Sequence, residues 1–380
     1  MLNPNDEQRL IQESARRLLD TEYAFEARQK RLAEDQEFSA ELWRQFAELG
    51  WLGLALPEDI GGFGGSDTEA ALLMQEFGRR IVVEPYLMSV VLGGGLVATG
   101  AQPELRQRVL QAMMAGDLQL AVALAEPGAR YELQRVQTEA RAADGGYRLS
   151  GRKAVVLNGS AAHEIVVVAR TSGSVDEERG LTLFVVPADA DGVRITGYRL
   201  NDGQRAADIE LTQVAVGADR VLGDVDAGFE LLDGAVDRAT VAACAEALGA
   251  MDAVMDMTAE YLKTREQFGR PLSANQALKF RMVDLHFAVE ESRSMTQGAL
   301  HALNEAPAAR RAAVSAMKYK VGQTARLVGQ EGIQLHGAIG MTEEYAVGHY
   351  YKRLETLRLL FGDPEYHLAR YGRWRQARNH

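Results

Sequence analysis

Two short runs, EIVVVAR (164–170) and LTLFVVP (181–187), decide the fold class of this chain. Both are rich in β-branched residues and are bounded by turn residues, as strands are. ADIELTQVAV (207–216) alternates apolar and polar residues, and ADGGYRLSG (143–151) is typical of a hairpin whose Asp-Gly-Gly turn supplies positive φ angles. The sequence therefore predicts a β region over about residues 118–222.

Helical periodicity flanks this β region on both sides. The first predicted helix covers residues 5–20, and its expected apolar face consists of Leu10, Ile11, Ala15, Leu18 and Leu19. Past the β region, VAACAEALGAMDAVMDMTAEYL (241–262) is too apolar for a surface helix and is expected at the centre of a bundle. A later apolar stripe, within residues 310–331, consists of Val314, Met317, Val321 and Val328. These patterns predict an α+β chain.

The composition is that of an ordinary globular protein, since 47% of the 380 residues are apolar and 25% are charged. The formal net charge of −11 argues against nucleic acid as the main partner, because phosphate neutralisation needs a basic surface. A single cysteine, Cys244, rules out an intramolecular disulfide. The seven histidines lack metal-ligand spacing, so no metal site is predicted.

The sequence predicts neither an export signal nor a membrane span. The N-terminal residues are amphipathic and charged, without an apolar signal core. The best candidate for a span, YLMSVVLGGGLVATG (86–100), is too short to cross a bilayer and too rich in glycine, so a buried helix is the better interpretation. We therefore expect a cytoplasmic protein.

The first candidate site follows the apolar helix, in TREQFGRPL (264–272). The polar side chains in this segment and just beyond it are Arg265, Gln267, Asn275 and Gln276. A guanidinium with nearby amides suits a pyrophosphate group. The alternative is a helix C-terminus that carries a cation favourable to the helix dipole and binds no ligand.

Two further segments are candidate ligand contacts. In QLHGAIG (334–340) the glycines would let the backbone approach a ligand closely, although no βαβ unit surrounds them as a dinucleotide fingerprint requires. The alternative for this segment is a plain loop between helices. AEPGA (125–129) leaves the first predicted strand and would expose backbone donors and acceptors, but its signal is weak by itself.

Taken together, these segments resemble the acyl-CoA dehydrogenase family of flavoproteins over nearly the full length. The matching motifs, in family order, are PEDIGGFGGSDTEAALLMQEFGR (57–79), AEPGA (125–129), LNG (157–159), YLKTREQFGRPLSANQ (261–276) and QEGIQLHGAIGMTEEY (330–345). The resemblance implies an N-terminal helical domain (1–116), a middle antiparallel β domain (117–224) and a C-terminal four-helix bundle (225–380). It also implies an FAD cofactor, oligomerisation and α,β-desaturation of an acyl-CoA thioester.

The reaction that the resemblance implies needs a base. The α proton of a thioester is weakly acidic, so a carboxylate removes it while donors stabilise the negative charge that develops on the carbonyl oxygen. The β hydrogen leaves as hydride to the flavin. In relatives the base is a glutamate in one of two places, which correspond here to Phe361, just before Gly362, and to Ala239 on the apolar helix. Neither side chain can accept a proton, so we predict no catalytic residue.

Three carboxylates could serve as a relocated base, namely Glu246, Asp363 and Glu365. However, DPEYH (363–367) is typical of a helix start, with aspartate as the N-cap, proline at the first position and an acid in the first turn. Glu246 lies in an alanine-rich run, where burial could raise its pKa, but a polar contact within the bundle is the favoured interpretation.

The flavin-ring half of the implied site departs from the family, whereas the adenine and pyrophosphate half does not. Relatives place a tryptophan and a threonine against the flavin, where this chain has Val155 and Leu157. The other departures are Arg130, Tyr131 and Glu132 in place of Gly-Ser-Asp, and Thr240 in place of a substrate-side arginine, although Asp237 is retained. The cofactor-binding residues that the resemblance implies are Arg265, Gln267, Phe268, Asn275, Gln276, Gln334 and Gly337.

In the family, the TREQFG-like arginine and the QLHG-like loop reach the FAD of a neighbouring subunit. A chain that keeps both but lacks a base resembles one half of a heteromer, and LLFGDPEYHLAR (359–370) resembles the small subunits of two-gene enzymes such as the pimeloyl-CoA type. We expect a dimer or tetramer with a homologous subunit, an acyl-CoA substrate and an electron-transferring flavoprotein as acceptor. The alternatives are a self-sufficient dehydrogenase with a relocated base, and a non-catalytic scaffold.

Overall fold

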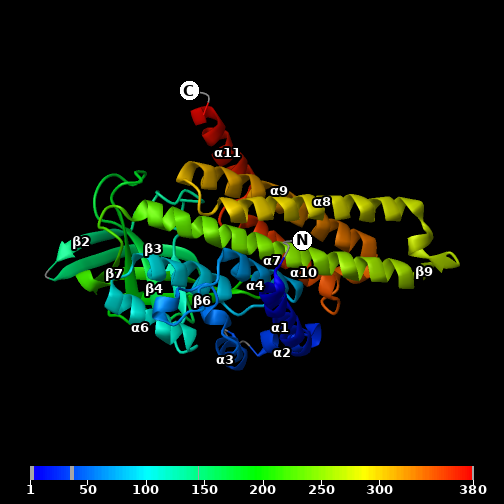
Figure 1. The fold of residues 1–380 in the computed structure, drawn as a ribbon, viewed down its shortest axis with the longest axis horizontal. Coiled ribbons are helices and arrows are strands. Elements are labelled where there is room, and N and C mark those ends of the chain that lie inside the picture. Colours follow the sequence, from blue (N-terminus) through cyan, green and yellow to red (C-terminus); the bar gives the residue numbers. More distant parts are fainter. Residues whose placement is uncertain (1–3, 35–37, 144, 379–380) are drawn as a thin grey trace. The chain divides into compact units, whose positions relative to one another are not determined.

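The β-branched runs lie within an eight-stranded sheet, drawn largely in green in Figure 1, in a computed structural model that describes residues 4–34, 38–143 and 145–378. The strands are β1 Leu120–Ala123, β2 Glu139–Ala143, β3 Gly146–Leu157, β4 Glu164–Arg170, β5 Leu181–Pro187, β6 Val193–Arg199, β7 Arg205–Gly217 and β8 Val221–Leu222. Their order is β6-β7-β3-β2-β4-β5-β8, with β1 beside β4. Every residue of β4 is buried, including the charged residues Glu164 and Arg170 at its two ends.

The sheet is mixed, so the predicted antiparallel β domain is wrong for two pairings. β1 runs parallel to β4, with Leu120 opposite Glu164, and β2 runs parallel to β4, with Glu139 opposite Arg170. The remaining neighbours in this sheet are antiparallel. The parallel pairs were not predicted, because the sequence of one strand does not indicate the direction of a partner strand that is distant in the chain.

The hairpin predicted for residues 143–151 is present, because β2 and β3 pair antiparallel with Ala143 opposite Gly146. Gly145 has a φ of 73°, as predicted, and Asp144 lies outside the described residues. The positive φ predicted for Gly146 was wrong. Gly146 already belongs to β3 and pairs with Gly217, at a point where a Cβ would lie 2.1 Å from the carbonyl oxygen of Val216.

The chain forms two compact units that alternate along the sequence. The sheet unit contains Glu34–Ser66 and Val83–Ala239, and the helical unit contains Met1–Ala33, Asp67–Val82 and Thr240–His380. The helices of the sheet unit are α3 Ala40–Glu48, the π-helix η3 Leu87–Gly94, α5 Gly95–Gly100, α6 Pro103–Met114 and the first part of α7 Gly228–Thr264, with 3-10 turns η1 Trp51–Gly53, η2 Glu58–Ile60 and η4 Ala218–Arg220.

The apolar segment 86–100 is a largely buried helix, which confirms the prediction. Its π-helical part packs against β1, where the hydroxyl of Ser89 accepts a hydrogen bond from the Leu120 N–H at 2.9 Å. A Cβ on Gly93 would come within 2.7 Å of the Leu120 Cβ, so glycine permits this close approach. Within the described ranges, no helix is long and apolar enough to cross a bilayer.

The helical unit is built around α9, which packs against α8, α10 and α11 (Figure 1). Its elements are α1 Asp6–Glu22, α2 Phe25–Ala33, α4 Asp67–Arg79, the second part of α7, β9 Glu266–Gln267, β10 Arg270–Pro271, η5 Leu272–Ala274, α8 Gln276–Ala302, α9 Pro307–His336, η6 Gly337–Met341, α10 Ala346–Leu359 and α11 Pro364–Arg378. Burial of the expected residues confirms the stripe of Val314, Met317, Val321 and Val328. The central helix predicted over residues 241–262 is confirmed for its first part, since residues 241–251 of α7 are buried throughout, whereas Asp256 and Glu260 are exposed.

Two glycines let α4 and α7 approach each other closely. A Cβ on Gly78 would lie 1.9 Å from the carbonyl oxygen of Glu246, and a Cβ on Gly249 would lie 1.8 Å from that of Gln75. The contact is reciprocal, so each helix needs a residue without a side chain where the other backbone passes.

The first predicted helix is α1, but its buried face is narrower than expected. Ala15 and Leu19 are buried, whereas Leu10 is 65% exposed. Leu10 and Ile11 are neighbours in sequence and therefore point about 100° apart on a helix, so the packed stripe cannot include both fully.

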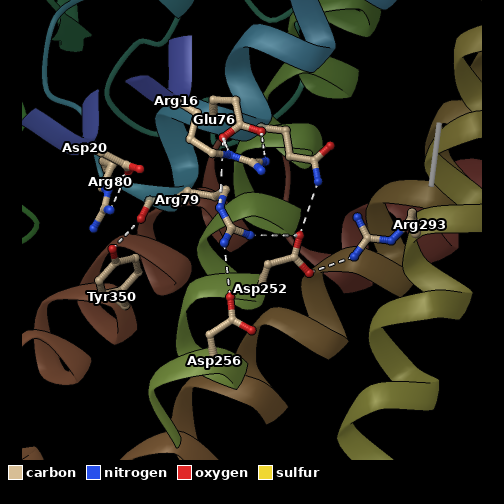
Figure 2. Close-up of polar contacts among 10 residues, drawn as sticks. Arg16, Asp20, Glu76, Arg79, Arg80, Asp252, Asp256, Arg293 and Tyr350 are labelled. Carbon is tan, nitrogen blue, oxygen red and sulfur yellow. Dashed lines mark hydrogen bonds and ion pairs between the residues drawn. The ribbon is translucent and has the colours of Figure 1, made fainter. Parts of the chain in front are cut away.

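An ion-pair network ties α4, α7 and α8 together within the helical unit (Figure 2). Arg79 lies 3.1 Å from Asp256 and 3.8 Å from Asp252, and Asp252 also accepts a 2.7 Å hydrogen bond from Arg293. Arg16 of α1 adds a 2.7 Å contact to the buried Glu76. Most of these side chains remain partly exposed, so each ion pair contributes modestly to the stability of the fold. The contribution of the network comes from the several pairs together.

Candidate functional site

The TREQFGRPL segment forms a tight hairpin at the end of α7. The Arg265 N–H still donates to the Tyr261 carbonyl at 2.8 Å, and β9 and β10 then pair antiparallel with Gln267 opposite Arg270. Phe268, at the tip, is fully exposed and has a φ of 55°, which is unusual for a bulky residue. The hairpin therefore presents Arg265, Gln267 and Phe268 to solvent.

An aromatic cluster joins the end of α7 to the end of α9. The ring centroids of Tyr261 and His336 are 4.6 Å apart, and those of His336 and Tyr345 are 5.0 Å apart. Burial lowers the pKa of His336, so a neutral imidazole packs between the two tyrosines. Arg265 lies one turn beyond Tyr261, and Gly337 follows His336, so the structure brings the two predicted motifs to the same end of the bundle.

The predicted cofactor-binding residues differ in their exposure and in the hydrogen bonds that they form within this chain. Arg265, Gln276 and Gln334 are exposed, and within the described ranges no residue pairs with the Arg265 guanidinium. The Gln267 amide donates to the neighbouring carbonyl of Glu266 at 2.7 Å. Gly337 has a φ of 69° and no atom within 4 Å of the place where a Cβ would be. The open backbone at Gly337 and the exposed guanidinium fit the pyrophosphate half of FAD.

Asn275 is engaged within its own turn. Its side-chain oxygen accepts a hydrogen bond from Arg270 at 2.9 Å, and its side-chain nitrogen donates to the Leu272 carbonyl at 3.0 Å. The amide thus holds the exit of the hairpin, which positions Gln276 at the start of α8.

The flavin-ring half of the predicted site lies in the sheet unit, where the AEPGA loop meets β3. The Ala154 N–H donates to the Ala125 carbonyl at 2.9 Å, and a bulge follows between Lys153 and Val156. Val155, inside this bulge, has a φ of 52° and is 53% exposed, while Leu157 is buried. Their side chains offer no polar group to the heteroatoms of a flavin ring, so this half fits FAD less well than the pyrophosphate half does.

Glu126 holds the AEPGA loop in place. Its carboxylate accepts hydrogen bonds from the Lys153 ammonium at 2.7 Å, the Thr138 hydroxyl at 2.6 Å and the Gln137 N–H at 2.6 Å. Burial opposes ionisation, but Lys153 and the hydrogen bonds hold the pKa of Glu126 below its ordinary value. A carboxylate with its acceptor sites occupied in this way is a structural anchor of the loop.

Neither place where relatives carry the base holds a carboxylate. Phe361 is half-buried with a φ of 60°, and Ala239 is fully buried in α7. Glu246 is buried as well, and both of its oxygens accept hydrogen bonds from Arg353, at 2.6 and 2.8 Å. The polar contact predicted for Glu246 within the bundle is therefore confirmed.

The DPEYH segment is a helix start, as predicted. The Asp363 carboxylate accepts a hydrogen bond from the Tyr366 N–H at 2.8 Å, and α11 begins at Pro364 with Glu365 exposed in its first turn. This geometry is that of an N-cap followed by proline at the first helical position. The side chain of Asp363 thus stabilises α11, which accounts for its position without a catalytic role.

Replacing Gly362 with alanine is expected to lower the stability of the folded protein by about 1–3 kcal/mol. Gly362 has a φ of 120°, and a Cβ there would lie 2.6 Å from both His367 Nε2 and Tyr366 Cδ1. Thermal and urea unfolding of the variant measure the loss. Gly372→Ala is the matched control, since no atom lies within 4 Å of its Cβ position. Equal stability of the two variants would contradict the expectation.

Backbone strain gathers at the motifs that the sequence singled out. Eight described residues other than glycine have a positive φ. The five that lie on or beside the family motifs are Arg130, Val155, Asn158, Phe268 and Phe361. Strained backbone persists only where the surrounding structure over-determines it, and it is common at functional sites.

Sequence reasoning missed several residues that shape these segments. The Asn158 side chain ties the β3 exit to β1 by donating to the Leu120 carbonyl at 3.1 Å. Tyr261 and Tyr345 enclose His336. The residues of the aromatic cluster belong to two quoted motifs, 261–276 and 330–345, but only the fold brings them together.

Comparison with known proteins identifies the family. The acyl-CoA dehydrogenase N-terminal, middle and C-terminal domains match residues 5–117, 121–214 and 226–375 in turn. A relative named acyl-CoA dehydrogenase FadE27, from Mycobacterium tuberculosis, is 30% identical over 346 residues, which cover 89% of each chain. This chain belongs to the acyl-CoA dehydrogenase family. It is accordingly an FAD-dependent oxidoreductase that acts on acyl-CoA thioesters.

Two solved structures are similar to this chain over almost its whole length. The structure of the ChsE4–ChsE5 complex from Mycobacterium tuberculosis matches with a TM-score of 0.88 and 28% identity, covering 98% of this chain and 97% of that one. A structure described as the FAD complex of PigA has the same fold, with a TM-score of 0.90 and 21% identity over 100% of both chains. The three-domain fold expected from the sequence is therefore confirmed.

Proposed function

We propose that this chain is the base-lacking small subunit of a heteromeric FAD-dependent acyl-CoA dehydrogenase of the two-gene kind. Its role is to complete the cofactor site of a homologous subunit that carries the catalytic glutamate. The observation that carries this proposal is the turn at Phe361-Gly362, where the side chain before the glycine is aromatic. The similar ChsE4–ChsE5 structure is described as a complex of two different chains, which supports a heteromeric arrangement.

The residues of this chain suit a binding role toward the cofactor. FAD supplies the hydride acceptor of the reaction when bound. Arg265 would pair with its pyrophosphate, and the open backbone at Gly337 would allow close approach. The remaining proposed contacts of the adenosine half are Gln267, Phe268, Gln276 and Gln334, with Asn275 holding the hairpin that carries them. The base that removes the α proton would belong to the partner subunit, and an electron-transferring flavoprotein would accept the electrons.

The alternative of a relocated base has less support. Arg353 occupies both oxygens of Glu246, and Asp363 caps α11. A base must reach the proton it abstracts with an oxygen that is not already committed to strong donors. Glu365 is exposed, so its carboxylate remains a candidate base. The variant Glu365→Gln tests this alternative. If the isolated chain catalyses turnover and Glu365→Gln abolishes it, a relocated base is favoured.

The decisive experiment is the FAD content of this chain, purified alone and co-purified with a homologous chain that carries a glutamate before the corresponding glycine. We expect little flavin in the chain alone and flavin together with acyl-CoA-dependent turnover in the pair. Substituting the partner's glutamate by glutamine is expected to abolish turnover without removing flavin. Close to one FAD per chain in the isolated protein, with turnover, would overturn the proposal.

Arg265→Ala is expected to weaken FAD binding by the two-chain enzyme about ten- to a hundredfold, because it removes charge-assisted hydrogen bonds to an anion. Titration of the apoprotein pair with FAD, followed by flavin fluorescence, measures the change. Lys263→Ala is the matched control, since Lys263 is an exposed cation on the same end of α7. Unchanged FAD affinity in Arg265→Ala would remove this residue from the proposed site.

A further inference from the structure

His349 lies in the first turn of α10, against α2 and beside the segment 342–345. Only 10% of its side chain is exposed, and its ring packs on that of Phe25 with the centroids 5.1 Å apart. A histidine held between two elements can change its partners when it takes up a proton. This inference concerns the helical unit alone and does not rest on the proposed function.

One ring nitrogen of His349 faces two kinds of partner. Nε2 lies 3.2 Å from the side-chain nitrogen of Gln29, which is a donor, and 3.0 Å from the Glu343 carbonyl, which is an acceptor. The Glu343 carboxylate is a second acceptor, at 3.3 Å. A ring nitrogen either accepts with its lone pair or donates its proton, so Nε2 cannot pair with Gln29 and Glu343 at the same time.

Arg28 fixes the orientation of the Gln29 amide. The guanidinium of Arg28 donates to Gln29 Oε1 at 3.3 Å, so the amide nitrogen is the atom that faces the ring of His349. Turning the amide over would place its NH₂ group against a cation, because both groups are donors. Gln29 therefore presents a donor to His349.

We expect the neutral ring to pair with Gln29 and not with Glu343. The contact with Gln29 is partly buried, whereas the Glu343 side chain is 72% exposed and its carboxylate already pairs with Lys352 at 2.8 Å. A shielded donor without a partner costs more free energy than an exposed acceptor that water can reach. The proton of the neutral ring is therefore expected on Nδ1, which leaves Nε2 as the acceptor.

The charges around His349 come from all three elements that contact it. Burial has the largest effect on the pKa of His349 and lowers it. The carbonyl and carboxylate of Glu343 raise this pKa, and the cations Arg28 of α2 and Lys352 of α10 lower it further. The net pKa is below the ordinary histidine value, so the ring is neutral near pH 7 and takes up its proton below about pH 6.5.

We propose that His349 is a proton-operated switch: the neutral ring ties α10 to α2 through Gln29, and the protonated ring ties α10 to the segment 342–345 through Glu343. When the ring takes up a proton from water, the hydrogen bond from Gln29 breaks, because both ring nitrogens are then donors. A charge-assisted hydrogen bond from Nε2 to Glu343 forms in its place. Protonation therefore loosens α2 and fastens the segment 342–345.

The segment 342–345 connects this switch to the candidate cofactor segments. Tyr345, at its end, packs on His336 with the ring centroids 5.0 Å apart, and Gly337 follows His336 in the chain. A change in the hydrogen bonds of Glu343 is therefore two residues away from the aromatic cluster that holds the α7 and α9 motifs together.

The test is an NMR titration of the purified full-length chain with ¹⁵N-labelled histidine rings, in which His349→Gln identifies the signals of His349. We expect the proton of the neutral ring on Nδ1. Gln29→Leu removes the donor to the neutral ring and is expected to raise the proton affinity of His349 about three- to tenfold. Glu343→Gln removes a charge that favours the protonated ring and is expected to lower this affinity about two- to fivefold.

Two controls accompany the titration. Glu344→Gln removes an exposed carboxylate at the next position and is expected to leave the proton affinity of His349 unchanged. His286, exposed on α8, is the internal reference in every sample. A proton on Nε2 of the neutral ring, or changes of the same sign in Gln29→Leu and Glu343→Gln, would overturn the proposal.

Hydrogen exchange at about pH 7.5 and about pH 5 follows the two ties directly. The variant His349→Gln is the reference at each pH, because glutamine does not titrate. On acidification the wild-type protein is expected to lose protection in α2, and to gain it in the segment 342–345, relative to this variant. If acidification changes the protection of both regions equally in the two proteins, His349 does not exchange its partners and the proposal fails.

Discussion

Arg353→Ala is expected to lower the free energy of unfolding by about 3–5 kcal/mol, because it leaves the Glu246 carboxylate buried without a counter-ion. Both side chains are at most 5% exposed, and the two hydrogen bonds between them are 2.6 and 2.8 Å long. The pair joins α10 to the centre of α7, so the loss falls on the core of the helical unit. Urea unfolding followed by circular dichroism measures it.

A double variant separates the cost of an unpaired charge from the cost of lost packing. Arg353→Met combined with Glu246→Leu removes both charges and keeps similar side-chain volume, and it is expected to be much more stable than Arg353→Ala. The matched control is Arg79→Ala, whose ion pairs to Asp252 and Asp256 are partly exposed and are expected to matter less. If Arg353→Ala is no less stable than Arg79→Ala, the buried pair does not carry the stability assigned to it.

Local signals in the sequence were sufficient for the elements that they describe. The aspartate, proline and acid at residues 363–365 predicted the cap and the first turn of α11, and the Asp363 to Tyr366 hydrogen bond confirms them. The β-branched run at residues 164–170 predicted a strand, and β4 spans the same residues. In both cases the decisive interactions lie within a few residues or follow from side-chain type alone, so neighbouring sequence contains the information.

Interactions between distant segments were beyond such signals. Arg353 lies 107 positions from Glu246, and the sequence around each residue does not indicate that the two form an ion pair. The parallel pairing of β1 with β4 has the same cause, since strand direction depends on the path of the intervening chain. Leu10 was placed on the buried face because it is apolar, yet helix geometry left it exposed.

The candidate site was predicted as separate motifs, and the fold supplies their relation. The aromatic stacking of Tyr261 on His336 brings the α7 and α9 motifs together, which spacing in the sequence could not establish. The hydrogen bond that the Asn275 side-chain oxygen accepts from Arg270 could not be predicted either, because it depends on the conformation of the turn between them. By contrast, the sequence alone shows that no acid precedes Gly362, since this depends only on the identity of residue 361.

The stability of the protein is expected to fall as pH decreases below about 6.5, and His367 is expected to account for a large part of the fall. Burial lowers the folded-state pKa of His367 to about 3, whereas an unfolded histidine titrates near 6.5. Between these values the unfolded chain binds a proton that the folded chain does not. Stability is therefore complete above pH 6.5 and declines toward pH 3 by up to about 1.4 kcal/mol per pH unit for this one group.

His367→Gln isolates this contribution, because glutamine keeps an N–H donor for the Phe361 carbonyl but does not titrate. Unfolding free energies measured from pH 7 to 5 are expected to decline less steeply in the variant than in the wild-type protein. His301→Gln, at an exposed position, is the matched control and is expected to retain the wild-type slope. His336 and His349 also have pKa values lowered by burial, so the comparison rests on the difference between slopes and not on the slope itself. Identical slopes in His367→Gln and His301→Gln would mean that folding does not lower the pKa of His367, and burial of this ring could not then be a cause of the acid sensitivity.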